Sequence, residues 1–299
     1  MDSIDLIVLD FDGTFTDVPP SVEPYLAAYG GLLSQWLYSA GTGAHAKEGI
    51  SGREWRDMCA RLARRSPEVG WALTTTPSAP IGADPYILAG EAAAFIARQR
   101  GIVAAVPGDL YTQAYTYAPA DWRREAADVL KRLMSSGKEV AFVSNASSAK
   151  IEARLSELLG DAWRGRIAVR GGANKFKIDE LPHPDDAGGA SGLTADVRDA
   201  FGNLPAGAPG PGRPIYLRRG SYFATLAMLW NGDPSRIGRT IVCGDIWELD
   251  LAMPSALGAQ VHLIERAEPF GAYEYERDAA DARGSRSSDL LGLLARLGL

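Results

Sequence analysis

Cysteine is scarce in this sequence, and the two cysteines lie far apart. Cys59 and Cys243 are separated by more than half of the 299 residues, without a C-x-x-C pair or a Cys/His cluster of zinc-binding spacing. This argues against a disulfide framework and against a zinc site of the usual kind. A reducing cytosol is the simplest compartment for such a chain, so we expect a cytoplasmic protein.

Long apolar runs are also missing. Asp2 and Asp5 lie near the N-terminus, where the apolar run covers only Leu6–Leu9. No other run approaches the roughly 18 residues of a membrane span. We therefore expect neither a signal peptide nor a membrane-spanning helix.

The chain has no excess of basic residues. It carries 31 basic and 37 acidic side chains, for a formal net charge of −6. Without a basic field, binding to nucleic acid or to an anionic membrane is disfavoured. Small anionic substrates stay open as ligands, because a local cluster of cations can override the net sign.

The residues that are present fit an ordinary globular α/β protein, with 46% hydrophobic and 23% charged residues. The length allows one large domain or a core with a smaller second domain. Short stretches that predict strands lie at residues 6–9, 140–143, 166–170, 240–243 and 260–264. Between these stretches, apolar residues recur at the spacing of a helix at 121–137, 151–160 and 221–230. This alternation predicts a mostly parallel sheet with helices on both faces.

Two regions interrupt the alternation. Residues 17–120 contain helix-like stretches without a buried-strand pattern, which indicates an inserted helical module. Residues 179–214 are rich in Pro, Gly and Asp and predict a long irregular excursion on the surface. The expected domains are a core of residues 1–16 and 121–299 and a helical domain of residues 17–120.

Three of the predicted strands end in polar side chains. These are Asp10 and Asp12 after the first strand, Ser144 and Asn145 after the second, and Asp245 with Asp250 after the fourth. Ligands of open parallel sheets collect at the carboxyl ends of the strands. Up to four carboxylates in one crevice disfavour joint ionisation unless a cation lies among them. We therefore predict a Mg²⁺ site with Asp10, Asp12, Asp245 and Asp250 as its ligands.

The same residues predict phosphoryl transfer. An aspartate at a strand end beside a metal can attack phosphorus and form an aspartyl-phosphate, a role that we give to Asp10. Asp12, two residues on, is placed to protonate the leaving group and then to deprotonate water. Gly13 permits the turn, and the Ser144 hydroxyl can hold phosphate oxygens. Asn145 either joins that phosphate site or caps the following helix.

Three stretches in this order, D-F-D-G-T, V-A-F-V-S-N and I-V-C-G-D-I-W-E-L-D, resemble motifs I, II and IV of the haloacid dehalogenase-like hydrolase superfamily. The resemblance covers about residues 4–16 and 121–265. It implies a Rossmann-like core, a cap inserted after motif I, a Mg²⁺ cofactor and usually phosphoryl transfer. The helical insertion at 17–120 lies where that superfamily places its first type of cap.

Motif III of the superfamily is a lysine that neutralises the phosphate and the nucleophile, and here the match is incomplete. Arg219, in L-R-R-G-S-Y-F, occupies the matching position before the helix that precedes motif IV. Lys175, in G-G-A-N-K-F-K, is the rival, and Lys177 also stays open. We prefer Arg219 on spacing, although its planar guanidinium is not interchangeable with an ammonium group.

The leading functional hypothesis is a Mg²⁺-dependent phosphohydrolase of a small phosphorylated metabolite. The first alternative is a catalytically degenerate binding or regulatory protein of the same fold, suggested by the missing motif III lysine. The second is a 2-haloacid dehalogenase, but such enzymes work without the metal and generally lack the second aspartate, here Asp12. The pattern at Leu290–Leu297 predicts a helix that packs on the core, with homodimerisation as the alternative.

Overall fold

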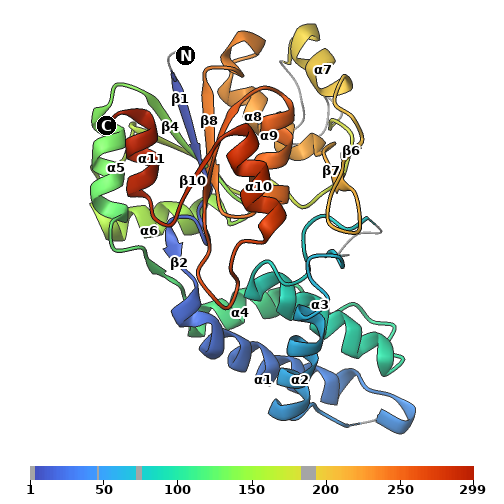
Figure 1. Ribbon diagram of the computed structural model, residues 1–299. Helices are drawn as coiled ribbons and strands as arrows, with labels where there is room; N and C mark the ends of the chain where they lie inside the picture. Colours follow the sequence, from blue (N-terminus) through green and yellow to red (C-terminus); the bar gives the residue numbers. More distant parts are fainter. Residues whose placement is uncertain (1–3, 46, 72–75, 183–192) are drawn as a thin grey trace. The chain divides into compact units, whose positions relative to one another are not determined.

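The computed structural model describes residues 4–45, 47–71, 76–182 and 193–299 (Figure 1). The chain forms two compact units. The first comprises Met1–Thr16, Trp122–Ala267 and Gly271–Leu299, and the second comprises Asp17–Asp121 and Glu268–Phe270. The short stretch Glu268–Phe270 joins the second unit from far along the chain, because Phe270 is buried in the apolar cluster of that unit.

The first unit is built on a six-stranded sheet with the order β10-β9-β8-β1-β4-β5. Its strands are β1 (Leu6–Leu9), β4 (Glu139–Val143), β5 (Ile167–Arg170), β8 (Thr240–Gly244), β9 (Gln260–Ile264) and β10 (Ser285–Ser287). Neighbouring strands of this sheet are parallel. The chain builds outward from β1 to β5 on one side and from β8 to β10 on the other. The strand order therefore reverses beside β1, where open α/β sheets form their ligand-binding crevice.

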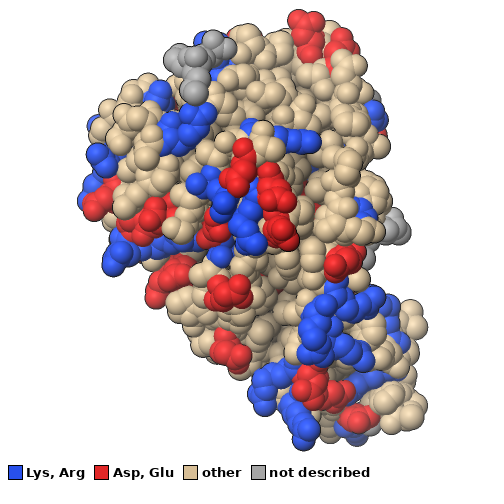
Figure 2. All heavy atoms as spheres, viewed as in Figure 1, with Lys and Arg blue, Asp and Glu red and all other residues tan. Residues whose placement is uncertain are grey.

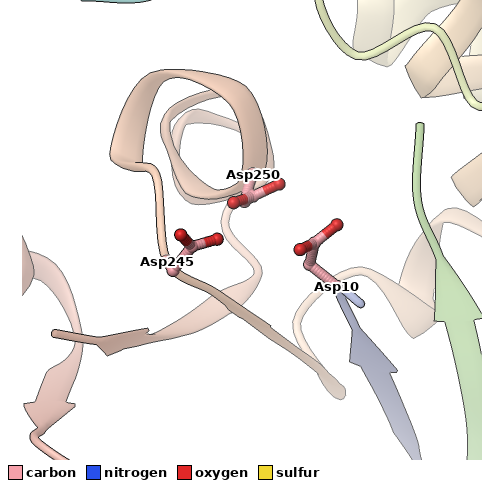
Figure 3. Close-up of side chains that lie close together, drawn as sticks. All are labelled: Asp10, Asp245 and Asp250. Carbon is pink, nitrogen blue, oxygen red and sulfur yellow. The ribbon is translucent and has the colours of Figure 1, made fainter. Parts of the chain in front are cut away.

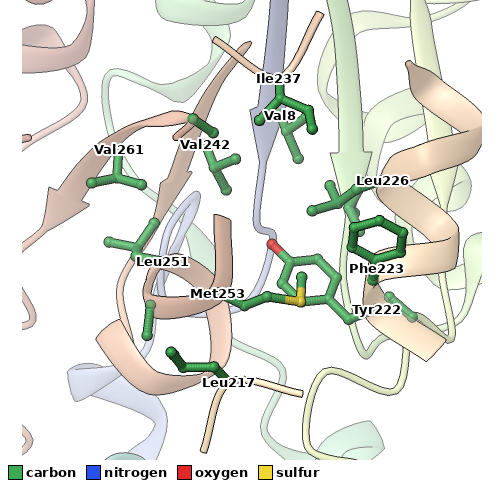
Figure 4. Close-up of a cluster of buried hydrophobic side chains, with 14 of the residues drawn as sticks. Val8, Leu217, Tyr222, Phe223, Leu226, Ile237, Val242, Leu251, Met253 and Val261 are labelled. Atoms are coloured by element: carbon green, nitrogen blue, oxygen red, sulfur yellow. The ribbon is translucent and has the colours of Figure 1, made fainter. Parts of the chain in front are cut away.

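Helices cover both faces of this sheet. The apolar cluster on one face includes side chains of α5 (Ala126–Ser135), α6 (Ser148–Leu159) and α11 (Leu291–Leu297). The cluster on the other face includes side chains of α7 (Ala195–Gly202), α8 (Gly220–Leu229), α9 (Ala252–Ala256) and α10 (Glu274–Arg283). Figure 4 shows part of this second cluster. Alternate residues of β1 enter opposite clusters: Leu6 and Val8 one, Ile7 and Leu9 the other. A strand buried on both faces must be apolar throughout. The predicted parallel sheet with helices on both faces is confirmed.

Two short ribbons complete the first unit and its connections. Strands β2 (Thr16–Asp17) and β3 (Asp121–Trp122) pair where the chain passes between the units, so the helix predicted over residues 121–137 begins only at α5. Strands β6 (Gly207–Ala208) and β7 (Ile215–Tyr216) form an antiparallel pair.

The excursion expected at 179–214 is more ordered than its composition suggests. Its residues 183–192 lie outside the described residues, but α7 and the β6–β7 pair fall within or beside the rest. The side chain of Thr194 accepts a hydrogen bond from the backbone of Val197 and caps α7. Val197 and Phe201 are buried in the core of the first unit. Burial of these apolar side chains offsets the cost of ordering a segment rich in Gly and Pro.

The described part of the second unit contains the helices α1 (Val22–Ala40), α2 (Gly52–Ala63), α3 (Pro85–Gln99) and α4 (Asp109–Tyr117). Helix α2 buries Trp55, Met58, Cys59 and Leu62 on one side. Five arginines in and just after α2 are exposed: Arg53, Arg56, Arg61, Arg64 and Arg65. Figure 2 shows Lys and Arg side chains gathered on this part of the surface, a local excess in a chain of net negative charge.

Helix length and apolarity also bear on the membrane question. Helix α1 is the longest described helix, with 19 residues. Across the described ranges, neither α1 nor any other helix is long and apolar enough to cross a bilayer.

Strand β9 carries a histidine that is buried between two serine hydroxyls of β10. The distances are 2.8 Å from His262 Nδ1 to Ser285 Oγ and 2.8 Å from His262 Nε2 to Ser287 Oγ. Burial, with a smaller contribution from Arg296, lowers the pKa of His262 from 6.5 to about 4. As the pH falls, the imidazole of His262 is protonated in the unfolded chain before it is protonated in the folded protein. The free energy of unfolding therefore decreases as the pH falls from about 6.5 toward 4.

We expect His262 to lower the free energy of unfolding of the first unit by about 2 kcal/mol between pH 7 and pH 5. A His262→Gln variant should lack this component, whereas His45→Gln, which replaces a partly exposed histidine of the second unit, should keep it. Urea titrations at a series of pH values measure the difference. Equal slopes of the unfolding free energy against pH in the wild type and His262→Gln would contradict the assignment.

Candidate active site

Three carboxylates meet at the carboxyl ends of the two neighbouring strands β1 and β8. Asp10 follows β1, Asp245 follows β8, and Asp250 lies in the π-helical turn Trp247–Leu251 (η4). One oxygen of each carboxylate lies within 4.8 Å of the others (Figure 3). All three residues are buried, with exposed fractions of 7%, 3% and 3%. The convergence predicted from the strand ends is confirmed for these three side chains.

The backbone brings the carboxylates together through close approach at two glycines. The amide of Asp10 donates to Cys243 O at 2.8 Å, which continues the β1–β8 ladder into the site. Gly13 has φ +81°, and a Cβ there would lie 2.3 Å from Asp245 Oδ2. A Cβ on Gly244 would lie 2.4 Å from the Cβ of Asp250. Position 13 therefore requires glycine for two reasons: the positive φ is unfavourable for other residues, and a side chain would collide with the Asp245 carboxylate.

The turn between Asp245 and Asp250 is fixed from outside by buried hydrogen bonds. Arg266 donates to the carbonyl oxygen of Asp245 and pairs with Glu276 at 2.5 Å. Glu276 Oε1 accepts from the amide of Trp247 at 3.0 Å. Within the turn, Asp250 Oδ2 accepts from the amide of Ile246 at 3.0 Å. A π-helical turn is rare and is frequently found at functional sites.

A threonine hydroxyl joins two of the carboxylates. Thr14 Oγ1 lies 3.2 Å from Asp10 Oδ2 and 3.2 Å from Asp245 Oδ1, and the residue is fully buried. One hydroxyl hydrogen serves one acceptor at a time, so it relieves only part of the repulsion between the two carboxylates. Thr14 is the last residue of D-F-D-G-T, and the sequence alone does not indicate this contact.

A lysine, Lys175, contacts two of the three carboxylates. Its Nζ lies 2.7 Å from Asp10 Oδ1 and 2.8 Å from Asp250 Oδ1, with 2% of the side chain exposed. The preference for Arg219, made on spacing, is wrong. Arg219 is fully buried, but it donates to the carbonyl oxygens of Tyr216 and Lys175. Lys177 is exposed. Arg219 thus holds the backbone that carries Lys175.

Asn145 and Ser144 lie at the end of β4, next to β1. Asn145 Oδ1 accepts from the backbone amide of Lys175 at 2.8 Å, so this side chain positions the lysine loop. The cap of α6 is Ser147 rather than Asn145, because the Ser147 side chain accepts from the amide of Lys150. Ser144 is 2% exposed, and its hydroxyl accepts from the amide of Ala146 at 3.4 Å.

Asp12 lies outside the three-carboxylate cluster, so the expectation of four clustered carboxylates is corrected to three. Its two oxygens accept hydrogen bonds from Lys150 Nζ at 3.1 and 2.9 Å. Both side chains are partly buried, with 17% of Asp12 and 19% of Lys150 exposed. Lys150 also lies over the ring of Phe11, 5.8 Å from its centroid. Sequence reasoning missed Lys150, since a lysine in the first turn of a helix carries no distinctive signal.

The electrostatics of the cluster fit a divalent cation. Burial raises the pKa of Asp10 to about 7, a rise that Lys175 opposes and Asp250 adds to. Burial alone would lower the pKa of Lys175, but Asp10 and Asp250 raise it well above its usual value. When Asp10, Asp245, Asp250 and Lys175 are all ionised, these four side chains together carry a net charge of −2. Carboxylate oxygens are the ligands that Mg²⁺ prefers, so Asp10, Asp245 and Asp250 could hold that ion.

A comparison of two alanine substitutions tests the close approach at Gly13. Gly13→Ala and Gly137→Ala both place a side chain at positive φ, +81° and +75°, but at Gly137 the new Cβ meets nothing within 4 Å. Both variants should lose about 1–2 kcal/mol of stability from the backbone conformation. Only Gly13→Ala should also displace the Asp245 carboxylate and weaken Mg²⁺ binding, measured by calorimetry. Equal Mg²⁺ affinities in the two variants would contradict the role given to Gly13.

No protein-family model and no curated protein matches the sequence. Among solved structures, a predicted phosphoglycolate phosphatase from Haemophilus somnus 129pt aligns with 99% of this chain and 98% of its own at 14% identity and a TM-score of 0.49. The putative HAD-hydrolase YfnB from Bacillus subtilis aligns with 100% of both chains at 12% identity and a TM-score of 0.47. A dehalogenase with an intermediate complex aligns with 100% of this chain and 99% of its own at 16% identity and a TM-score of 0.46. This chain resembles the haloacid dehalogenase-like hydrolase superfamily in the order of its sequence motifs and in the carboxylate cluster to which they contribute.

Proposed function

We propose that the protein is a Mg²⁺-dependent phosphohydrolase of a small phosphorylated metabolite. The observation that carries the proposal is the buried cluster of Asp10, Asp245 and Asp250, in which Lys175 contacts Asp10 and Asp250. Such a cluster retains excess negative charge in a low-dielectric site, which suits a hard divalent cation. Bound there, Mg²⁺ would supply positive charge to the phosphate oxygens of a substrate.

The residues around the cluster support two half-reactions. In the first, a carboxylate oxygen of Asp10 attacks phosphorus, the bond from phosphorus to the leaving alcohol oxygen breaks, and Asp12 gives its proton to that oxygen. In the second, water attacks phosphorus, the acyl-phosphate bond breaks and the proton of the water passes to Asp12. Lys175 stabilises the negative charge beside Asp10 in both steps, and the Ser144 hydroxyl is available to bind a phosphate oxygen.

The two alternatives have less support. The degenerate binding protein was suggested by the missing motif III lysine, and Lys175 now provides an ammonium group 2.7 Å from Asp10. A 2-haloacid dehalogenase needs neither the metal nor a second aspartate at position 12. Asp12 is held in place by its contact with Lys150, although the dehalogenase reaction would not use this side chain.

Asparagine substitutions of the two motif I aspartates test the roles. Asp10→Asn should reduce kcat by at least about 10³-fold, because an amide is a poor nucleophile. Asp12→Asn should reduce it by about 10²–10⁴-fold through loss of the proton transfer. Asp5→Asn, which changes a partly exposed carboxylate just before the same strand, is the matched control. Phosphatase activity is measured on a panel of phosphorylated metabolites, and full activity in both motif I variants would reject the mechanism.

Metal removal separates the phosphatase from the dehalogenase. We expect EDTA to abolish phosphate release and added Mg²⁺ to restore it, because the proposed ion would supply positive charge to the phosphate oxygens of the substrate. Beryllofluoride should bind to the wild type in the presence of Mg²⁺ and not to Asp10→Asn, as followed by fluorine NMR. Halide release from a 2-haloacid that survives EDTA would instead establish the dehalogenase.

A further inference from the structure

A buried ion pair lies directly behind the turn that separates Asp245 from Asp250. Glu248, in the middle of that turn, is 0% exposed. Its two carboxylate oxygens accept from Arg213 Nη1 and Nη2, each at 2.8 Å. The hydroxyl of Tyr275 on α10 donates to Glu248 Oε1 at 2.8 Å. This two-point contact of a guanidinium with a carboxylate fixes orientation as well as distance.

Arg213 lies in the segment 179–214, whose composition predicts an irregular excursion. It lies just before β7 and only 8% of its side chain is exposed. Six residues further on, Arg219 donates to the carbonyl oxygen of Lys175. The chain on the two sides of β7 thus reaches two parts of the candidate site: the turn with Asp245 and Asp250 through Arg213, and the lysine loop through Arg219.

The energetics of buried ion pairs indicate that the Arg213–Glu248 pair positions Glu248 rather than adding to the stability of the fold. Burying both members of an ion pair costs about as much desolvation energy as the pair regains, so apolar replacements of the whole pair are often neutral or stabilising. A pair of this kind is useful where it fixes one geometry. Here the geometry that it fixes is that of Glu248, two residues before Asp250 and three after Asp245 in a rare π-helical turn.

We propose that Arg213 is a positioning residue of the candidate metal site, which holds Glu248 and thereby sets the separation of the Asp245 and Asp250 carboxylates. This inference rests on the proposed function, since it assigns the cluster to a divalent cation. Arg213 acts through Glu248 and the turn. Its replacement should therefore weaken Mg²⁺ binding by about 10- to 100-fold, the usual effect of removing a partner of metal-ligating groups.

The test measures Mg²⁺ affinity by calorimetry on folded protein, together with thermal stability and kcat. Arg213→Met should bind Mg²⁺ about 10- to 100-fold more weakly, and Arg213→Lys should recover part of that loss. Arg236→Met is the matched control, because it removes an arginine that pairs with Glu139 at 2.6 Å on β4. The control should bind Mg²⁺ as the wild type does.

A double variant keeps the test decisive if Arg213→Met does not fold with Glu248 left unpaired. Arg213→Met with Glu248→Met removes both buried charges and should regain stability but not Mg²⁺ affinity. Wild-type affinity in the folded Arg213→Met or in the double variant would overturn the positioning role while leaving the proposed function intact. A wild-type protein that binds no Mg²⁺ would overturn the proposed function and this inference together.

Discussion

The contact of Lys175 with Asp10 and Asp250 is the interaction on which the arrangement of the site depends. Buried carboxylates a few ångströms apart repel one another strongly, because little water screens them. The lysine offsets part of that repulsion through two short contacts, at 2.7 and 2.8 Å. The net negative charge of these side chains fits the divalent cation that we propose for the site. The chain therefore needs a rigid frame around the cluster.

That frame combines close backbone approach at two glycines with buried side chains. Gly13 and Gly244 let two turns approach the aspartates to distances that any Cβ would prevent. The amide of Asp10 remains in the β1–β8 ladder, so the carboxylate starts from a fixed strand end. The strands themselves are held by apolar side chains on both faces of the sheet. The aspartate side chains are held in defined positions because the site is built at the ends of sheet strands rather than on long loops.

The sheet and the three clustered aspartates could be predicted from the sequence because both follow from local rules. An apolar run such as Leu6–Leu9, followed by polar residues and glycine, indicates a buried strand that ends at the binding edge. Lys175 could not be chosen over Arg219 in this way. Both residues are basic and both belong to loops, and only the packing of the α8 N-terminus against the lysine loop decides which one reaches Asp10. The Lys150 contact with Asp12 depends equally on tertiary packing.

The different use of lysine and arginine around the site has a physical reason. Lysine presents a compact charge on a flexible stem, so Lys175 can donate to two carboxylates that belong to different turns. Arginine presents a planar set of donors that matches two fixed acceptors. Arg213 accordingly binds both oxygens of Glu248, and Arg219 binds two carbonyl oxygens of the backbone. An arginine in the place of Lys175 would demand a more rigid acceptor geometry than two separate carboxylates offer. The chemistry of the two side chains therefore favours Lys175 as the contact of the carboxylates and Arg219 as the contact of the backbone carbonyl oxygens.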